Sequence, residues 1–245
     1  MELFKTISGN YSLSSSEMWY WLRYKNILIK AIMIFWILPI SIILKIISFI
    51  FSLGIFLDSF SSWLWNKRDN ALYSLESSTY RLSYKKTSYI LTPIEATLLF
   101  PYYILLGIIP KFSSVVSGNT DNNLDLGHGY FFKLGNLYLN LAKELLFNSF
   151  KHGILFFPIA IIITILIAPL STIVGIFFYL FIVLDLFGWF IVIIREFIVT
   201  SSGKLARTSS NNFFTIIINP PLLIILSPMY LLLIFIPKFS TYDNS

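Results

Sequence analysis

Four long apolar stretches run along the chain, and polar segments separate them. They cover Ile27–Leu57, Ile90–Ile109, Ile154–Ile194 and Thr215–Ile236. A helix needs about 20 apolar residues to cross the ~30 Å hydrocarbon core of a bilayer, and each stretch reaches that length. The pattern therefore predicts an all-α integral membrane protein that crosses the bilayer several times.

The first and third stretches are too long for one straight crossing. Ile154–Ile194 has 41 residues, about twice what one crossing uses at ~1.5 Å per residue. Pro39 and Pro169 stand inside these stretches, and proline removes a backbone donor from a helix. We expect either a helical hairpin that returns to the same face or one kinked helix with its excess at the interface. If one helix ran throughout, Lys45 would lie well inside the membrane and have to snorkel toward the headgroups.

The second and fourth stretches are long enough for one crossing each. Pro101 and Pro228 lie near their middles, where proline kinks a helix. Pro110 and Pro237 follow these stretches, each with a lysine directly after it. We therefore expect one Pro-kinked transmembrane helix in each place, ending with a lysine that reaches the headgroups.

The two halves of the chain resemble each other at a spacing of about 127 residues, which we call the repeat offset. Thr92–Ser114 and Asn219–Thr241 are identical at 11 of 23 aligned positions, including a shared Pro-Lys-Phe-Ser sequence. Hydrophobic bias could match leucine with leucine, but it would not also match prolines and a polar motif. The sequence therefore predicts two tandem repeats, residues 1–119 and 120–245.

Two segments outside the apolar stretches carry apolar residues at helical spacing. The stripe in Gly129–Phe150 comprises Leu134, Leu137, Tyr138, Leu141 and Leu145, with Phe147 or Phe150. Ser14–Tyr24 has a similar pattern. Both segments are predicted to be interfacial amphipathic helices. Ser113–Leu124, rich in Ser, Asn and Gly, is the predicted linker between the repeats.

Composition points to the bilayer as the solvent and to lipid as a partner. Charged residues make up 12% of the 245 positions, against about 25% in soluble domains. The formal net charge of +6 favours anionic headgroups. Nucleic-acid binding would need Lys and Arg clustered on a polar domain, which the sequence lacks. Other membrane proteins or a second copy of the chain are further candidate partners.

No motif of an enzyme is present in the sequence. There is no cysteine, so disulfides and thiolate chemistry are excluded. The two histidines, His128 and His152, lie in different loops without an acidic cluster, which makes a metal site an unfavoured interpretation. Nucleophile elbows, phosphate-binding loops and zinc-protease helices are all missing. We predict no enzymatic activity and no cofactor.

The candidate functional residues are charges in or beside the apolar stretches: Asp58, Asp185, Glu95, Lys45, Arg68 and Arg195. Acids near hydrocarbon are costly and usually have a partner or a function. The repeat offset relates Asp58 to Asp185 and Arg68 to Arg195. Each Asp is expected to cap a helix or bind an Arg, with ion or proton handling as the alternative. Glu95 has no acidic counterpart.

Three functions are compatible with this sequence. The favoured one is a membrane-shaping scaffold, whose Pro-centred hairpins and amphipathic helices would wedge into one leaflet. The second is a small channel or transporter with a pathway at the repeat interface, since repeats with broken helices build such pathways. The third is an accessory subunit or a secreted membrane-inserting effector. The sequence does not specify which membrane holds the protein.

Overall fold

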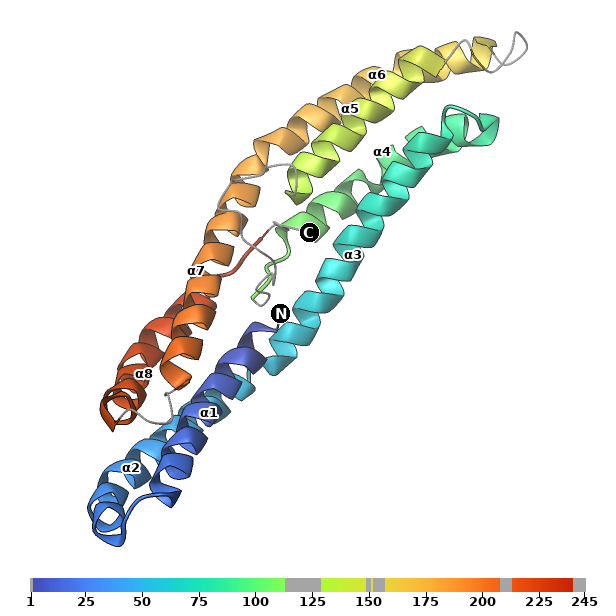
Figure 1. The fold of residues 1–245 in the computed structure, drawn as a ribbon. Coiled ribbons are helices and arrows are strands. Elements are labelled where there is room, and N and C mark those ends of the chain that lie inside the picture. The colour runs from blue at the N-terminus through green and yellow to red at the C-terminus, as the bar shows by residue number, and fades with distance from the viewer. Residues whose placement is uncertain (1, 113–128, 149–150, 152–156, 208–212, 240–245) are drawn as a thin grey trace. The chain divides into compact units, whose positions relative to one another are not determined.

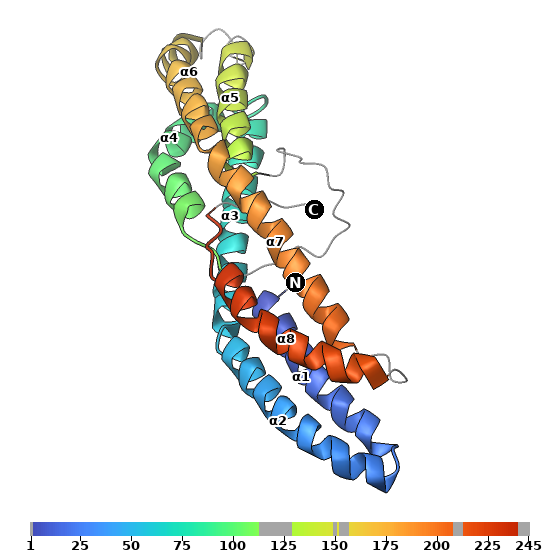
Figure 2. The ribbon, with the colours of Figure 1, turned by 90° about the vertical axis from the view of Figure 1, so that its left-hand side faces the viewer.

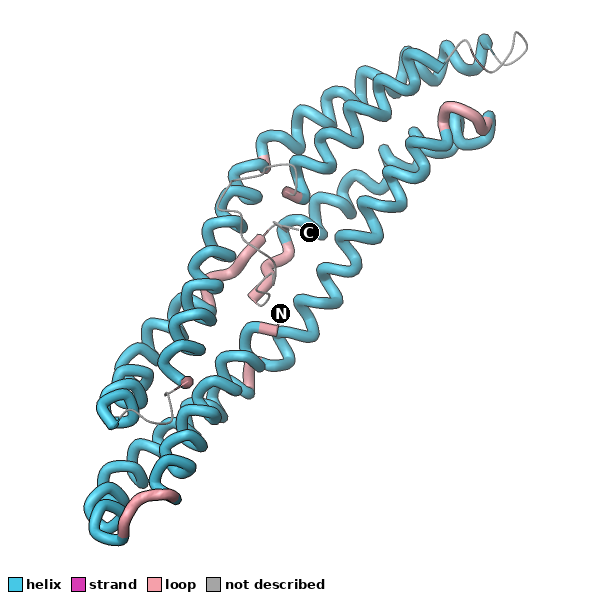
Figure 3. Tube along the Cα trace, in the orientation of Figure 1, coloured by secondary structure: helices cyan, strands magenta, loops and turns pink. Residues whose placement is uncertain are grey.

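The computed structural model describes residues 2–112, 129–148, 151, 157–207 and 213–239, and these residues are almost entirely helical (Figures 1 and 3). The predicted linker Ser113–Leu124 lies outside them. The helices are α1 (Leu3–Arg23), α2 (Ile27–Ser52), α3 (Ile55–Arg81), α4 (Lys86–Ile108), α5 (Tyr130–Asn148), α6 (Phe157–Leu180), α7 (Ile182–Ala206) and α8 (Phe213–Ile234). The all-α prediction is confirmed.

Four helical stretches in the described residues are long and apolar enough to cross a membrane. They are Ile27–Arg81, Lys86–Ile108, Phe157–Ala206 and Phe213–Ile234. Only 28% of the most apolar window of the first stretch is buried inside the protein. The side chains of Ile32 and Phe35 are 72% and 83% exposed. Exposing such apolar surface to water costs free energy, whereas exposing it to lipid does not. These helices are consistent with a multi-pass membrane protein.

The chain forms two compact units, and each combines segments from both halves of the sequence. Unit 1 comprises Met1–Ser62, Lys111–Ser117 and Ile191–Pro237, and unit 2 comprises Trp63–Pro110, Gly118–Phe190 and Lys238–Ser245. Helices α1, α2 and α8 thus belong to unit 1, and α4, α5 and α6 belong to unit 2. The predicted repeat boundary at residues 119 and 120 lies outside the described residues and stays a prediction.

Each unit has its own hydrophobic core. In unit 1 the core lies between α1, α2 and α8, with Tyr11, Leu44 and Leu223 fully buried. In unit 2 it lies between α3, α4, α5 and α6, where Tyr138 and Phe178 are buried. The rings of Tyr11 and Phe51 in unit 1 and of Tyr138 and Phe178 in unit 2 are both 5.4 Å apart between centroids.

Of the two predicted arrangements, the hairpin that turns at Pro39 and Pro169 does not occur. Helix α2 continues through Pro39, and α6 continues through Pro169. Both prolines lie on exposed faces of their helices. The interruptions fall later, at Leu53–Gly54 and at Phe181. Helices α1 and α2 are joined by a short polar turn at Tyr24–Asn26.

The segments predicted to be interfacial helices are helical, but most of their apolar stripes face protein, whereas Phe147 is exposed. Leu134, Tyr138, Leu141 and Leu145 of α5 are buried in the core of unit 2. Helix α5 packs along α6, and α1 packs along α2, in both views of the ribbon (Figures 1 and 2). Because these stripes are already buried against neighbouring helices, they are not free to insert into a leaflet.

Small residues bring these helix pairs close together. Ser8 of α1 and Ser48 of α2 exchange hydrogen bonds, with 3.1 Å between their hydroxyl oxygens. In unit 2 the repeat offset relates these two positions to Gly135 of α5 and Gly175 of α6, which meet each other. A Cβ built on Gly175 would lie 3.1 Å from the Gly135 carbonyl oxygen. Small side chains at such positions let two helix backbones approach closely.

We expect Gly175→Leu to separate α5 from α6 and to lower the free energy of unfolding by about 1–3 kcal/mol, as overpacking does. The matched control is Gly9→Leu, because a Cβ built on Gly9 of α1 meets nothing within 4 Å. The control should change stability by less than about 1 kcal/mol. Thermal unfolding of the detergent-solubilised protein, followed by circular dichroism, measures both. Equal losses in the two variants would contradict the close approach.

Candidate functional site

Asp58 and Asp185 cap helices other than their own. Asp58, in the first turn of α3, accepts hydrogen bonds from the backbone N–H groups of Phe4 (3.3 Å) and Lys5 (3.1 Å) in α1. Asp185, in the first turn of α7, accepts from Phe131 (3.3 Å) and Phe132 (2.9 Å) in α5. A carboxylate satisfies the open donors of a helix N-terminus and complements its dipole.

The close approach at α5 requires a glycine. Gly129 directly precedes α5, and a Cβ at that position would collide with the Asp185 carboxylate. At α1 the preceding residue, Glu2, makes no side-chain capping bond of its own. In both places, therefore, the cap comes from a distant carboxylate rather than from the local sequence.

Arg68 binds the C-terminal end of α4. Its guanidinium donates to the carbonyls of Leu106 (2.5 Å), Gly107 (3.3 Å) and Ile109 (2.7 Å). It also donates to the carbonyl of Phe239 at 2.7 Å, and all of these residues belong to unit 2. The last carbonyls of a helix have no partner within it, so a rigid cation with several donors fits this place.

Arg195 binds the end of α8 in the same way. It donates to the carbonyls of Ile234 (3.4 Å) and Ile236 (2.7 Å), which the repeat offset relates to Gly107 and Ile109. A further bond of 3.4 Å reaches the carbonyl of Lys111, and all of these residues belong to unit 1. Arg68 and Arg195 are 1% and 0% exposed, so each buried charge is held by helix ends.

Each buried acid interacts with the arginine from the other half of the sequence. Asp58 interacts electrostatically with Arg195 in unit 1, and Asp185 interacts with Arg68 in unit 2. The guanidinium of Arg68 also lies 5.8 Å from the ring centroid of Tyr130, a cation–π contact. Each unit therefore combines an acid from one half of the sequence with an arginine from the other half. We expected each Asp to cap a helix or to bind Arg68 or Arg195, without specifying which arginine belongs to which acid.

Lys111 and Lys238 were not among the candidate residues. We expected them to reach headgroups after Pro110 and Pro237, but they are 1% and 0% exposed. That expectation is wrong, since both lysines are buried in the protein. Lys111 belongs to unit 1 with Asp58, and Lys238 belongs to unit 2 with Asp185. The shared Pro-Lys-Phe-Ser sequence was the signal that could have identified them.

Two tyrosines also join segments from different halves. The hydroxyl of Tyr11 in α1 donates to the carbonyl of Leu223 in α8 at 3.0 Å, and that of Tyr138 in α5 donates to Ala96 in α4 at 2.6 Å. The repeat offset relates both the donors and the acceptors. Burial raises the pKa of both tyrosines above the usual value, so each hydroxyl keeps its proton and donates.

Pro101 and Pro228 lie inside α4 and α8, on exposed faces. A proline leaves the carbonyl four residues earlier without its helical donor. Pro228 frees the carbonyl of Ile224 in this way, and the Ser227 hydroxyl donates to it at 2.7 Å. A serine hydroxyl that donates to the freed carbonyl is one way in which helices in membranes tolerate proline.

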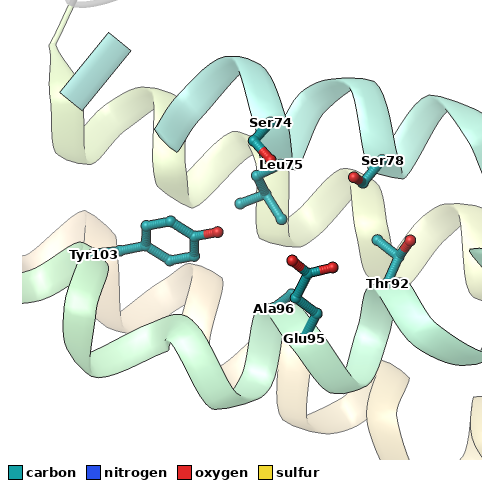
Figure 4. Close-up of a pocket in the computed structure, with 7 residues that line it drawn as sticks. All are labelled: Ser74, Leu75, Ser78, Thr92, Glu95, Ala96 and Tyr103. Carbon is teal, nitrogen blue, oxygen red and sulfur yellow. The ribbon is translucent and has the colours of Figure 1, made fainter. Parts of the chain in front are cut away.

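Lys45 and Glu95 are the two candidate charges that lie on exposed surface. Lys45 projects from α2 between buried neighbours. Glu95 was expected at the edge of its apolar stretch, but α4 begins at Lys86, which puts Glu95 near the middle of this candidate span. Its carboxylate lines a small pocket between α3 and α4 (Figure 4).

Unit 2 also has a larger polar hollow, of about 470 Å³. Its lining comes from the last turns of α3, from α5 and from residues just after these helices: Glu76, Thr79, Tyr80, Ser83, Leu137, Asn140, Glu144 and Lys151. Its volume is within the range of small-molecule sites, and its lining is more polar than is usual for them.

Among the described residues, no group of three or more His, Asp or Glu side chains could hold a metal ion. His128 and His152 lie outside the described residues. Comparison of the chain with known protein families, with curated proteins and with solved structures finds no match. Arguments about function therefore depend on the helix ends, the buried charges and the hollows described above.

We expect Arg68→Lys to lower the free energy of unfolding by about 2–3 kcal/mol, because one ammonium group cannot serve all the carbonyls that the guanidinium binds. Arg81→Lys is the matched control, since Arg81 is an exposed arginine of the same helix, α3. Thermal unfolding in detergent measures both. If Arg68→Lys is as stable as Arg81→Lys, Arg68 does not hold the end of α4.

Proposed function

We propose that this chain is a small membrane channel or transporter, built from two copies of one helical unit that exchange helices. The observation that carries the proposal is the arrangement of helix ends: α1 and α5 begin, and α4 and α8 end, at buried Asp and Arg side chains inside the two units. Transporters of duplicated architecture use interrupted helices whose ends line their pathways.

The recurrence of contacts at one offset supports the duplication. The caps made by Asp58 and Asp185, the tyrosine bonds to Leu223 and Ala96, and the arginine bonds to the helix ends all recur at the repeat offset. Chance similarity of apolar segments would not reproduce specific polar contacts. The exchange is reciprocal as well, because each half supplies an arginine to the other, as in a two-fold interface.

The membrane-shaping hypothesis has less support than it has from the sequence alone. It depended on turns at Pro39 and Pro169 and on amphipathic faces free to insert between lipids. The helices run through both prolines, and the apolar faces of α1 and α5 are buried. A scaffold of this kind would also not need the polar hollow of about 470 Å³ in unit 2.

An accessory or effector role stays a weaker proposal. The exposed apolar side chains of α2 and α6 are as suitable for lipid as for the helices of a partner. The pattern of these side chains does not favour a protein partner over lipid. It does not favour a second copy of the chain over lipid either.

Reconstitution into liposomes tests transport and membrane shaping in one sample. Vesicles containing the protein would carry tenfold gradients of Na⁺, K⁺, H⁺, Cl⁻ or phosphate, with a fluorescent reporter for each ion. We expect a flux above that of protein-free vesicles for at least one ion, growing in proportion to the amount of protein. Vesicles with an unrelated helical membrane protein control for leak.

Electron cryo-microscopy of the same vesicles gives the second readout. We expect vesicle diameters to match the protein-free sample. Tubulated or strongly narrowed vesicles, with no flux above the controls for any of these ions, would contradict the proposal and favour the membrane-shaping function.

A further inference from the structure

We infer that unit 2 contains a binding site for one small monovalent cation, sodium in size, at Glu95 between α3 and α4. The inference deepens the proposed function, on which it rests for a role in transport, by naming the class of ion. The site combines a carboxylate, several hydroxyl groups and a small pocket, and Glu95 itself lies in the candidate span Lys86–Ile108.

The site is built by two helix faces. Ser74 and Ser78 are one turn apart on α3, and Thr92, Glu95 and Tyr103 lie on one side of α4. Residues spaced three or four apart share a helix face. Figure 4 shows the Glu95 carboxylate between the Tyr103 hydroxyl and the two serines, with these groups turned toward the same space. Five side chains thus bring oxygen atoms to one pocket.

These oxygens are not engaged elsewhere in the described part of the chain. No hydrogen bond or ion pair of the Glu95 carboxylate occurs there, and the same holds for the side-chain hydroxyls of the other four residues. Tyr103 is close enough to interact electrostatically with Glu95. A charged carboxylate near the middle of a span is costly unless it has a partner. A bound cation would supply that partner.

The size and the charge of the pocket select the ion. Its volume is about 10 Å³, the space of about one water molecule. Calcium uses six to eight oxygens, commonly from several carboxylates, and this pocket offers one carboxylate. Magnesium is usually bound through carboxylates together with substrate phosphates. One carboxylate with neutral hydroxyls neutralises one positive charge. A dehydrated sodium ion meets both conditions.

The corresponding place in unit 1 is closed. The positions that match Ser74 and Tyr103 are Ser201 and Tyr230, and their hydroxyls are 2.8 Å apart in a direct hydrogen bond. Leu222 stands where unit 2 has Glu95. Unit 2 alone has an acid at this place, and its Ser74 and Tyr103 hydroxyls are not bonded to each other. A single ion site in a duplicated protein requires such a difference between the units.

The test is the thermal stability of the full-length protein in detergent at pH 7.5, in sodium chloride against choline chloride at equal ionic strength. We expect sodium to raise the midpoint of unfolding with saturation, by about 3–6 °C at ten times the dissociation constant. Potassium should have a smaller effect because of its size. Glu95→Gln, which keeps the shape and removes the charge, should abolish the shift.

Asp69→Asn is the matched control, because Asp69 is an exposed acid on α3 that lines neither pocket. It should keep the full sodium shift. The inference is overturned if sodium and choline give the same midpoint, if potassium equals sodium, or if Glu95→Gln keeps the shift. A midpoint that responds to pH through Glu95 but not to sodium would assign the site to a proton and also overturn it.

The two proposals can fail separately. Flux in vesicles that is unchanged in Glu95→Gln, together with no sodium shift, would reject the ion site and leave the transport function standing. A sodium shift that depends on Glu95, with no flux for any ion, would keep the site and reject transport.

Discussion

The whole structure depends on satisfying helix ends that lie inside the protein. The N-termini of α1 and α5 and the C-termini of α4 and α8 meet buried side chains rather than water. Each end leaves backbone groups without helical partners, and burying such groups unsatisfied costs several kcal/mol each in an apolar solvent, about 4–8 in the extreme case. Asp at the positive ends and Arg at the negative ends satisfy the groups and complement the dipoles.

This constraint couples the two halves of the chain. An Arg of one half and an Asp of the other occur in each unit, and the tyrosine bonds between α1 and α8 and between α5 and α4 join the same halves. Removing a helix end would therefore leave buried charges without partners in the other half. Each unit therefore depends on segments from both halves of the sequence, and each has its own core.

Much of this architecture could be predicted from the sequence, because apolar length and spacing determine helices directly. The helical class, the candidate spans and the charges Asp58, Asp185, Arg68 and Arg195 follow from that pattern. The turns at Pro39 and Pro169 were mispredicted because a proline removes one hydrogen bond from a helix and can kink it without ending it. The combination of segments from both halves in each unit was not predictable, since an offset within the sequence relates positions but does not say which segments pack together. Burial of Lys111 and Lys238 depends on that combination and was missed for the same reason.

Cross-linking of introduced cysteines tests the exchange most directly, and the chain has no cysteine to interfere. Asn10 of α1 donates to Ser202 of α7 at 2.9 Å, so Asn10→Cys with Ser202→Cys should cross-link under mild oxidation or with a short bifunctional maleimide. Leu75 is the position that matches Ser202 in the first half of the sequence. The account predicts cross-linking of the pair at 10 and 202 and none at 10 and 75. Cross-linking at 10 and 75 instead would mean that each repeat packs on itself, and would contradict the exchange.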